Sequence, residues 1–148
     1  MSMLVNQSAP DFSLMDDAGQ VFTLSEHRGQ RLLLVFYPGD NTPVCTAQLC
    51  DYRDGIEVFD GLGVQVVGIS ADDTESHRQF RAQHELPFVL LSDNDLRVAE
   101  AYGCKGLLGM KRGVFFLDEA HVVRYGHVES VAVFRRKRDE LVQIIQTL

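Results

Sequence analysis

The order of hydrophobic and polar positions divides the chain into alternating strands and helices. Residues 31–38 form an almost continuous apolar run with β-forming residues at its end, which is typical of a strand buried on both faces. Residues 64–70 have the same character. Between these two runs, apolar side chains recur at intervals of three and four from Leu49 to Phe59, which predicts a helix over residues 43–59. Further along and at the chain ends, the pattern predicts a hairpin over 11–26, a helix over 72–85, a strand over 88–93, a short helix ending at Gly103, two strands around a turn over 113–128, and an amphipathic C-terminal helix.

Strands that alternate with helices favour a layered α/β domain. The closing pair of strands and the last helix predict a mixed sheet rather than a purely parallel one. The chain has 148 residues, an ordinary size for one domain, and it contains no repeat or linker. We therefore expect a single domain over residues 1–148, with three layers.

Composition narrows the classes of function. Hydrophobic residues make up 45% of the chain and the net charge is −7, so we expect no nucleic-acid or membrane partner. The one basic run, "RRKR" at 135–138, is interpreted as a solvated helix face.

The N-terminal segment lacks the pattern of a secretion signal, and the three cysteines are an odd number, unlike the paired cysteines of a disulfide-rich secreted protein. We therefore expect a reducing compartment, the cytoplasm.

Two of those cysteines lie in the stretch "FYPGDNTPVCTAQLC", residues 36–50. Thr42 is a favoured N-cap residue and Pro43 a favoured first helical residue, so Cys45 falls in the first turn of the predicted helix. Unpaired backbone N–H groups and the positive end of the helix dipole stabilise a thiolate there. The pattern predicts a nucleophilic cysteine at the edge of the sheet where α/β folds bind ligands.

The motif "PGDNTPVC" resembles the peroxiredoxin signature, with Pro38, Thr42 and Cys45 in the family's order. The second cysteine in "CTAQLC" is similar to the bacterioferritin comigratory protein branch, also called PrxQ. The segments "APDFSLMDDAGQVFTLSE", "VVGIS" and "RGVFFLD" also resemble the family. The resemblance implies a thioredoxin-like three-layer fold with a mixed central sheet and an N-terminal β-hairpin.

The resemblance also implies a thiol-dependent peroxidase that reduces hydrogen peroxide and organic hydroperoxides without a cofactor or metal. Cys45 would be the peroxidatic cysteine, Thr42 would bond the thiolate and the peroxide, and Pro38 would shield the pocket from water. Arg112 would hold the thiolate and the peroxide oxygens. The partner would be thioredoxin or a similar dithiol reductant, and the protein would be a monomer or weak dimer. The alternative function is a thiol sensor or disulfide-exchange protein that relays oxidation to a partner, and a third is a silent thioredoxin-like binding domain.

Cys50 is the candidate resolving cysteine, but an intact helix keeps it from Cys45. Five residues along an ideal helix separate Cα atoms by about 8.5 Å, whereas a disulfide needs less than about 7 Å. We therefore expect the start of the helix to unwind in each cycle. Cys104 matches no family position; it is interpreted as a free thiol, with a backup resolving role or an intermolecular disulfide left open. Gln48 replaces a glutamate common in this branch, so an acid role there is lost.

A zinc site is not predicted, because the cysteines lack paired spacing and histidine neighbours. The scattered histidines are interpreted mostly as surface residues.

Overall fold

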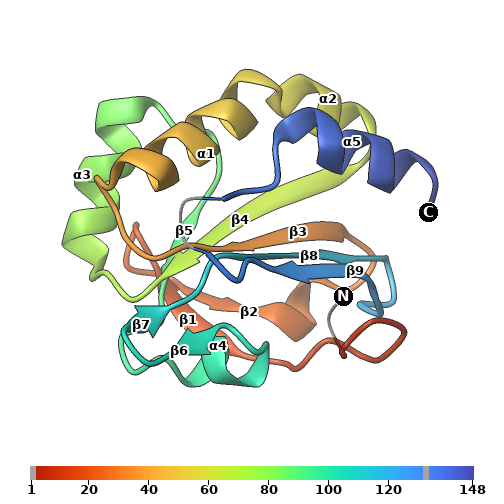
Figure 1. The fold of residues 1–148 in the computed structure, drawn as a ribbon, viewed down its shortest axis with the longest axis horizontal. Coiled ribbons are helices and arrows are strands. Elements are labelled where there is room, and N and C mark those ends of the chain that lie inside the picture. Colours follow the sequence, from red (N-terminus) through yellow and green to blue (C-terminus); the bar gives the residue numbers. More distant parts are fainter. Residues whose placement is uncertain (1–2, 132–133) are drawn as a thin grey trace.

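A seven-stranded mixed sheet forms the centre of the protein (Figure 1). The computed structural model describes residues 3–131 and 134–148. The strand order is β2-β1-β5-β4-β3-β8-β9. The strands are β1 (Ser13–Asp16), β2 (Val21–Thr23), β3 (Arg31–Phe36), β4 (Val64–Ser70), β5 (Leu90–Ser92), β8 (Gly113–Leu117) and β9 (Val123–Val128). Strand β3 is parallel to β4 and antiparallel to β8, which confirms a mixed sheet, and β1 and β2 form the predicted N-terminal hairpin.

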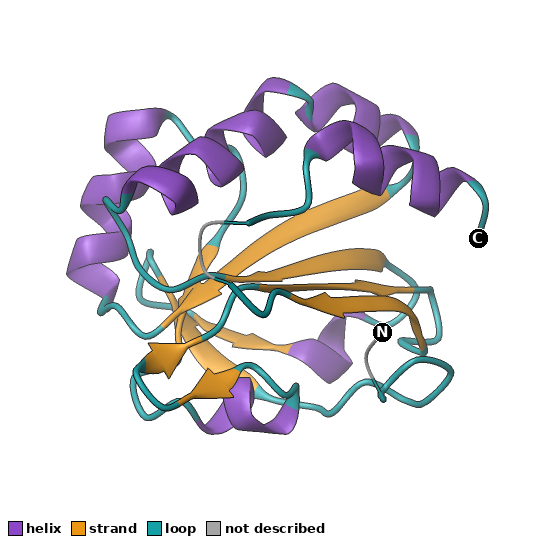
Figure 2. Cartoon of the chain, in the orientation of Figure 1, coloured by secondary structure: helices purple, strands orange, loops and turns teal. Residues whose placement is uncertain are grey.

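Helices cover both faces of this sheet, as Figure 2 shows. One face carries α1 (Pro43–Asp54), α2 (Ile56–Gly61), α3 (Thr74–His84) and α5 (Arg138–Gln146), and the other carries the 3₁₀ helix η1 (Leu24–His27) and α4 (Arg97–Ala101). A hydrophobic core lies on each face of the sheet. Because side chains alternate along a strand, Leu33 and Val35 of β3 point into the core under α1, and Leu32 and Leu34 point into the core under α4. We call these the α1-face core and the α4-face core. The fully apolar run 31–36 is thus buried on both sides, as its composition predicts.

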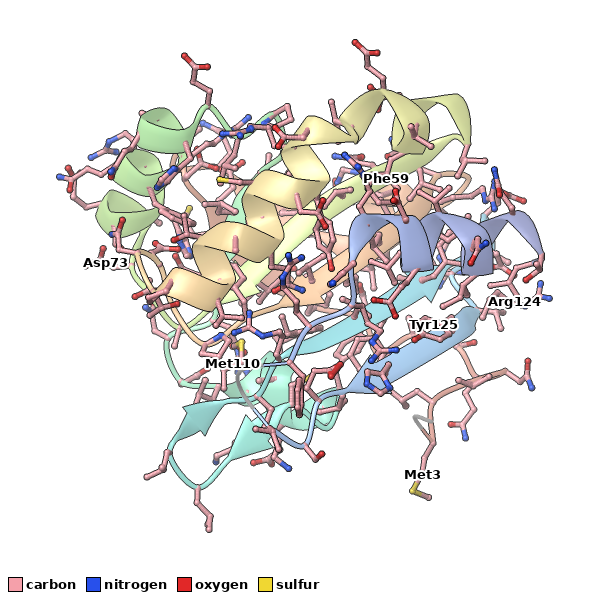
Figure 3. All side chains as sticks on the ribbon, turned by 45° about the horizontal axis from the view of Figure 1, so that its top comes forward. Met3, Phe59, Asp73, Met110, Arg124 and Tyr125 are labelled. Atoms are coloured by element: carbon pink, nitrogen blue, oxygen red, sulfur yellow. The ribbon has the colours of Figure 1, made fainter. Side chains whose placement is uncertain are left out.

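The helix predicted over 43–59 is interrupted. Gly55 (φ −110°, ψ 18°) ends α1 and precedes α2. Apolar residues before and after the break face the same core: Tyr52 and Phe59 pack edge to face in the α1-face core. A Cβ atom at position 55 would overlap the side chain of Arg138, so a larger residue there would displace this arginine. Figure 3 shows Phe59 among the side chains between the helices and the sheet.

The prediction that the basic run 135–138 is a solvated helix face is wrong. Residues 135–137 precede α5, and only Arg138 begins it. Arg135 and Arg138 pair with Asp51 of α1, and Arg136 pairs with Glu129. Asp51, far away in the sequence, and Glu129, seven positions before Arg136, draw these arginines against the body of the protein.

The glycine-rich segment after α4 forms a small separate hairpin that the pattern did not predict. Its strands β6 (Lys105–Gly106) and β7 (Gly109–Met110) pair antiparallel. Each strand has two residues, too few for an alternating pattern to be recognised. No helix in the described part of the chain has both the length and the apolar character needed to cross a membrane.

Candidate active site

Cys45 lies where the sequence places it, as the third residue of α1. Thr42 takes the extended conformation of an N-cap residue (φ −85°, ψ 145°) and Pro43 is the first helical residue. The helix begins at the end of β3, so the thiol is held at the edge of the sheet. Cys45 is fully buried, with an exposed fraction of 0%.

The hydroxyl of Thr42 does not cap the helix, although the residue occupies the N-cap position. Its Oγ1 donates instead to the carbonyl oxygen of Gly39, 2.8 Å away. This bond closes the loop 38–42 on itself and fixes the hydroxyl beside the first turn of α1.

Arg112 contacts Cys45 although it lies 67 positions later in the sequence. It immediately precedes β8, whose Gly113 pairs with Phe36 at the end of β3. One guanidinium nitrogen, Nη1, lies 3.2 Å from Cys45 Sγ and 2.7 Å from Gln48 Oε1. Arg112 is only 3% exposed, so its charge faces the sulfur in a site with little water. A cation placed at this distance stabilises a thiolate and the negative charge that later moves to oxygen.

Gln48 connects Arg112 to the rest of the protein. Its amide oxygen accepts from Arg112, and its amide nitrogen donates to the hydroxyl of Tyr52, 3.0 Å away. Tyr52 in turn donates to the carbonyl oxygen of Arg136 at 2.5 Å. Burial raises the pKa of Tyr52, so its hydroxyl remains a donor. Gln48 therefore orients the arginine with a neutral group. The sequence identified position 48 only as a lost acid.

A cavity of about 730 Å³ opens beside this centre. Arg112 lines this cavity, and its guanidinium contacts Cys45, so this residue lies between the cavity and the sulfur. Leu107 and Leu108 at the tip of the β6–β7 hairpin are fully exposed, and Met110, labelled in Figure 3, follows on β7. The cavity is lined by Pro38, Lys105, Gly106, Leu107, Leu108, Gly109, Met110, Lys111, Arg112, Glu129 and Ser130. The sequence analysis did not predict this hairpin; the signal in the sequence is the pair Leu107 and Leu108 between two glycines, Gly106 and Gly109.

The other two cysteines occupy different environments. Cys50 lies on the same α1 helix as Cys45 and is half-buried, and the three cysteines of the described chain are free thiols. Cys104 belongs to the α4-face core, whereas Cys45 belongs to the α1-face core, so the sheet separates them. Burial raises the pKa of Cys104 to about 12, which keeps it a neutral thiol. Its sulfur packs so closely on Gly113 that a Cβ there would lie 2.6 Å away.

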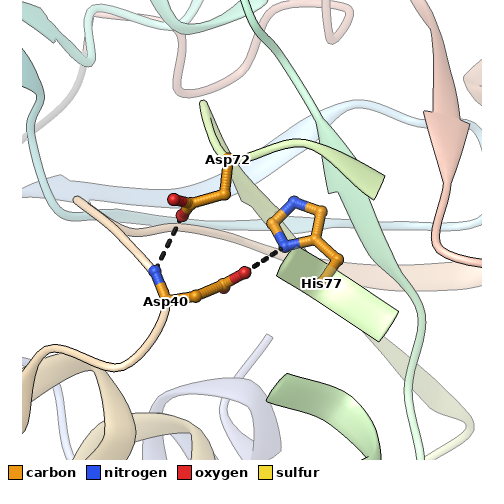
Figure 4. A group of neighbouring side chains, drawn as sticks. All are labelled: Asp40, Asp72 and His77. Carbon is orange, nitrogen blue, oxygen red and sulfur yellow. Dashed lines mark hydrogen bonds and ion pairs between the residues drawn. The ribbon is translucent and has the colours of Figure 1, made fainter. Parts of the chain in front are cut away.

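The prediction that the histidines lie mostly at the surface is wrong. His77 and His121 are buried (0% and 3% exposed), and the other three are half-buried. His77 joins Asp40 and Asp72 in a group of potential metal ligands (Figure 4). Both ring nitrogens of His77 already face oxygen partners, Asp40 Oδ2 and the carbonyl oxygen of Leu91. The imidazole therefore has no lone pair for a metal, and this group does not fit a metal site.

A comparison with protein families matches residues 5–126 to the AhpC/TSA family. The chain belongs to this family. Peroxiredoxin Bcp of Bacillus subtilis is 34% identical over 157 aligned residues, which cover 100% of this chain and 96% of that protein. Membership and this relative confirm the resemblance to the peroxiredoxins of the bacterioferritin comigratory protein and PrxQ branch. The chain is a thiol-dependent peroxidase, which acts on peroxides and is recycled by a thiol reductant.

Solved structures support the same fold. Peroxidoxin BcpB of Mycobacterium tuberculosis has a TM-score of 0.89 at 28% identity, and the match covers 100% of this chain and 98% of that one. Peroxiredoxin Q of Xanthomonas campestris has a TM-score of 0.83 at 26% identity, over 92% and 90% of the two chains. An equally similar structure, of the bacterioferritin comigratory protein of that species, comes from work on its alkyl peroxide reduction activity. These neighbours confirm the thioredoxin-like fold.

Proposed function

We propose that Cys45 is the residue that attacks the peroxide. The observation that carries this proposal is the buried contact of 3.2 Å between Arg112 Nη1 and Cys45 Sγ at the first turn of α1. The thiolate attacks one oxygen of the peroxide; a sulfur–oxygen bond forms and the O–O bond breaks. The departing oxygen takes a proton and leaves as water or an alcohol, and Cys45 becomes a sulfenic acid.

Arg112 serves two stages of this step. Before the reaction its charge stabilises the thiolate, and during the reaction it stabilises the charge that develops on the departing oxygen. Thr42 is the second donor: its hydroxyl turns from the carbonyl of Gly39 toward the peroxide. Pro38 lines the cavity and limits the water around the sulfur. Because Cys45 has no exposed surface, a small movement of these neighbours admits the peroxide.

The cavity supports organic hydroperoxides as substrates alongside hydrogen peroxide. The exposed side chains of Leu107 and Leu108, with Met110, offer apolar surface next to Arg112. An alkyl group packs on these side chains while the O–O bond meets the guanidinium. The Xanthomonas campestris relative that is described by alkyl peroxide reduction supports this assignment.

Cys50 resolves the sulfenic acid after α1 unwinds. The Cys50 thiolate attacks the Cys45 sulfur, water leaves, and a disulfide forms. Unwinding is confined to the part of α1 before Asp51. Asp51 accepts from Arg135 and from the backbone N–H of Arg138, and Tyr52 donates to the carbonyl of Arg136. These bonds hold the second half of α1 to the segment before α5. An oxidised structure with a 45–50 disulfide in an unbroken helix would refute this step.

Thioredoxin or a similar dithiol protein returns the disulfide to two thiols. We place the protein in the cytoplasm, as a monomer or weak dimer. The rival is a sensor that is oxidised once and passes the disulfide to another protein.

Turnover separates these functions. We expect rapid peroxide consumption with thioredoxin, lost in Cys45→Ser and retained in Cys104→Ala, which alters a thiol in the opposite core. Mass spectrometry after one equivalent of peroxide should detect a 45–50 disulfide. A single fast oxidation without recycling would favour the sensor, and an unreactive Cys45 would contradict both functions.

A further inference from the structure

A cluster of polar side chains, buried or half-buried, contacts the loop between β3 and α1 (Figure 4). Asp40, in the middle of this loop, is 9% exposed. Its Oδ1 accepts from the hydroxyl of Tyr37 at 2.6 Å. Its Oδ2 lies 2.7 Å from His77 Nδ1 and accepts from Ser76 Oγ at 2.8 Å. Both donors to Oδ2 belong to α3, so one carboxylate ties the loop to a helix far away in the sequence.

The backbone of the loop is fixed by a second acid. The N–H of Asp40 donates to Asp72 Oδ2 at 2.7 Å, and Ser70 Oγ donates to the same oxygen at 2.7 Å. Asp72 follows β4, which pairs with β3 directly. The loop is thus fastened both at its side chain and at its main chain.

Hydrogen-bond geometry and burial act together on Asp40 and His77. The carbonyl oxygen of Leu91 can only accept, so His77 Nε2, 3.0 Å away, carries a proton. Burial by itself raises the pKa of Asp40, but hydrogen bonds from His77 and Tyr37 outweigh it and leave this pKa below its ordinary value. An ionised Asp40 makes the 2.7 Å contact between its Oδ2 and His77 Nδ1 a bond to a charged group. Charge-assisted bonds of this kind are roughly twice as strong as neutral ones.

Asp40 lies two residues before Thr42, the N-cap of the helix that carries the nucleophile. Asn41, between Asp40 and Thr42, has a left-handed backbone (φ 64°), so the chain turns sharply there. Thr42 is the N-cap of α1 and donates to Gly39, on the other side of Asp40. A displacement of Asp40 therefore moves the N-cap and the first turn with it.

We propose that Asp40 and His77 are positioning residues that latch the active-site loop and keep the first turn of α1 in its peroxide-reactive form. The latch is closed when the thiolate attacks and opens when α1 unwinds toward Cys50. It thereby sets the balance between the two steps: a tighter latch favours peroxide attack, and a looser one favours disulfide formation. This inference rests on the proposed roles of Cys45 and Cys50.

Asp40→Asn tests the latch because it removes the charge and keeps the shape. The asparagine can still accept from Tyr37 and can donate to a neutral His77, so the fold is retained while the charge-assisted bonds become neutral. We expect the first oxidation by peroxide to slow about tenfold and disulfide formation to speed up by a similar factor, as expected from weakening a bond of this strength. Over-oxidation to sulfinic acid at high peroxide should fall in parallel. Stopped-flow measurement of the two steps, on the full chain, provides both rates.

Two further variants separate positioning from loss of stability. Val123→Ala removes buried volume from the α4-face core, far from the loop, and serves as a control for general destabilisation. His77→Asn keeps a neutral donor toward Asp40 and should resemble Asp40→Asn rather than an unfolded protein. Opposite changes in the two rates, absent from Val123→Ala, support the latch. Unchanged rates in Asp40→Asn, or the same changes in Val123→Ala, overturn it. If the wild type itself fails to oxidise at Cys45, the proposed function fails instead, which is a separate result.

Discussion

Removal of the Arg112 guanidinium should slow the attack on peroxide strongly. Nη1 lies 3.2 Å from Cys45 Sγ, and both groups are almost fully buried. Two unit charges at this distance interact by about 5 kcal/mol at an effective dielectric constant of about 20, which is an upper bound because charge is shared with oxygen during the reaction. Hydrogen bonds to charged groups contribute about 1.5–3 kcal/mol. Arg112→Ala should therefore lower the rate of the first step by roughly 10- to 150-fold.

The assay is a single-turnover reaction of the reduced protein with hydrogen peroxide, followed by stopped flow. Arg112→Lys keeps the charge but lacks the planar fork that serves Cys45 and Gln48 together, so it should recover only part of the rate. Arg78→Ala is the matched control, because Arg78 is an arginine of α3 whose side chain is 59% exposed and pairs only with a surface glutamate among the ion pairs of the described chain. A normal first-step rate in Arg112→Ala, with an intact fold by circular dichroism, would refute the reasoning.

Three further predictions address resolution, substrate and stability. Cys50→Ser should keep the first oxidation but slow turnover with thioredoxin and increase over-oxidation, as measured by steady-state assay and mass spectrometry; normal turnover would assign resolution elsewhere. Leu107→Ser and Leu108→Ser should leave the rate with hydrogen peroxide unchanged and lower the rate with cumene hydroperoxide, by roughly fourfold for each CH₂ group that the substrate buries; equal effects on both peroxides would exclude the hairpin from binding. The pKa of Asp40 is lower in the folded protein than in the unfolded chain, where it is about 4, so the ionised carboxylate stabilises the fold above about pH 4. This contribution is lost as the pH falls through the pKa of Asp40 in the folded protein. Urea unfolding at pH 7 and at pH 3 should therefore show a smaller loss of stability in Asp40→Asn than in the wild type, and equal losses would contradict the assignment.

Local rules account for what the sequence could predict. Thr42 and Pro43 specify a helix start because each has a conformational preference that acts within a few residues. The position of Cys45 in the first turn follows from this start. The strands over 31–36 and 64–70 were recognisable because burial on both faces requires an unbroken apolar run. The role of Arg112 depended on resemblance to a family, since no local pattern distinguishes it from a surface arginine.

The tertiary structure decided the contacts between residues far apart in the chain. Gly55, where α1 ends, lies directly against the side chain of Arg138 at the start of α5. Cys104 is separated from Cys45 by the sheet, although the sequence left it as a candidate partner.

The sequence by itself determined the class of fold, the start of the helix and the cysteine that it activates, because these depend on neighbours along the chain. Only the tertiary structure determined what surrounds that cysteine. Gln48 orients Arg112 through one network, and Asp40 and His77 fasten the loop through another. His77 lies 37 positions from Asp40, and no periodicity encodes such a pairing. Folding brings the two side chains to within 2.7 Å of each other, and this contact holds the loop that precedes the helix of Cys45.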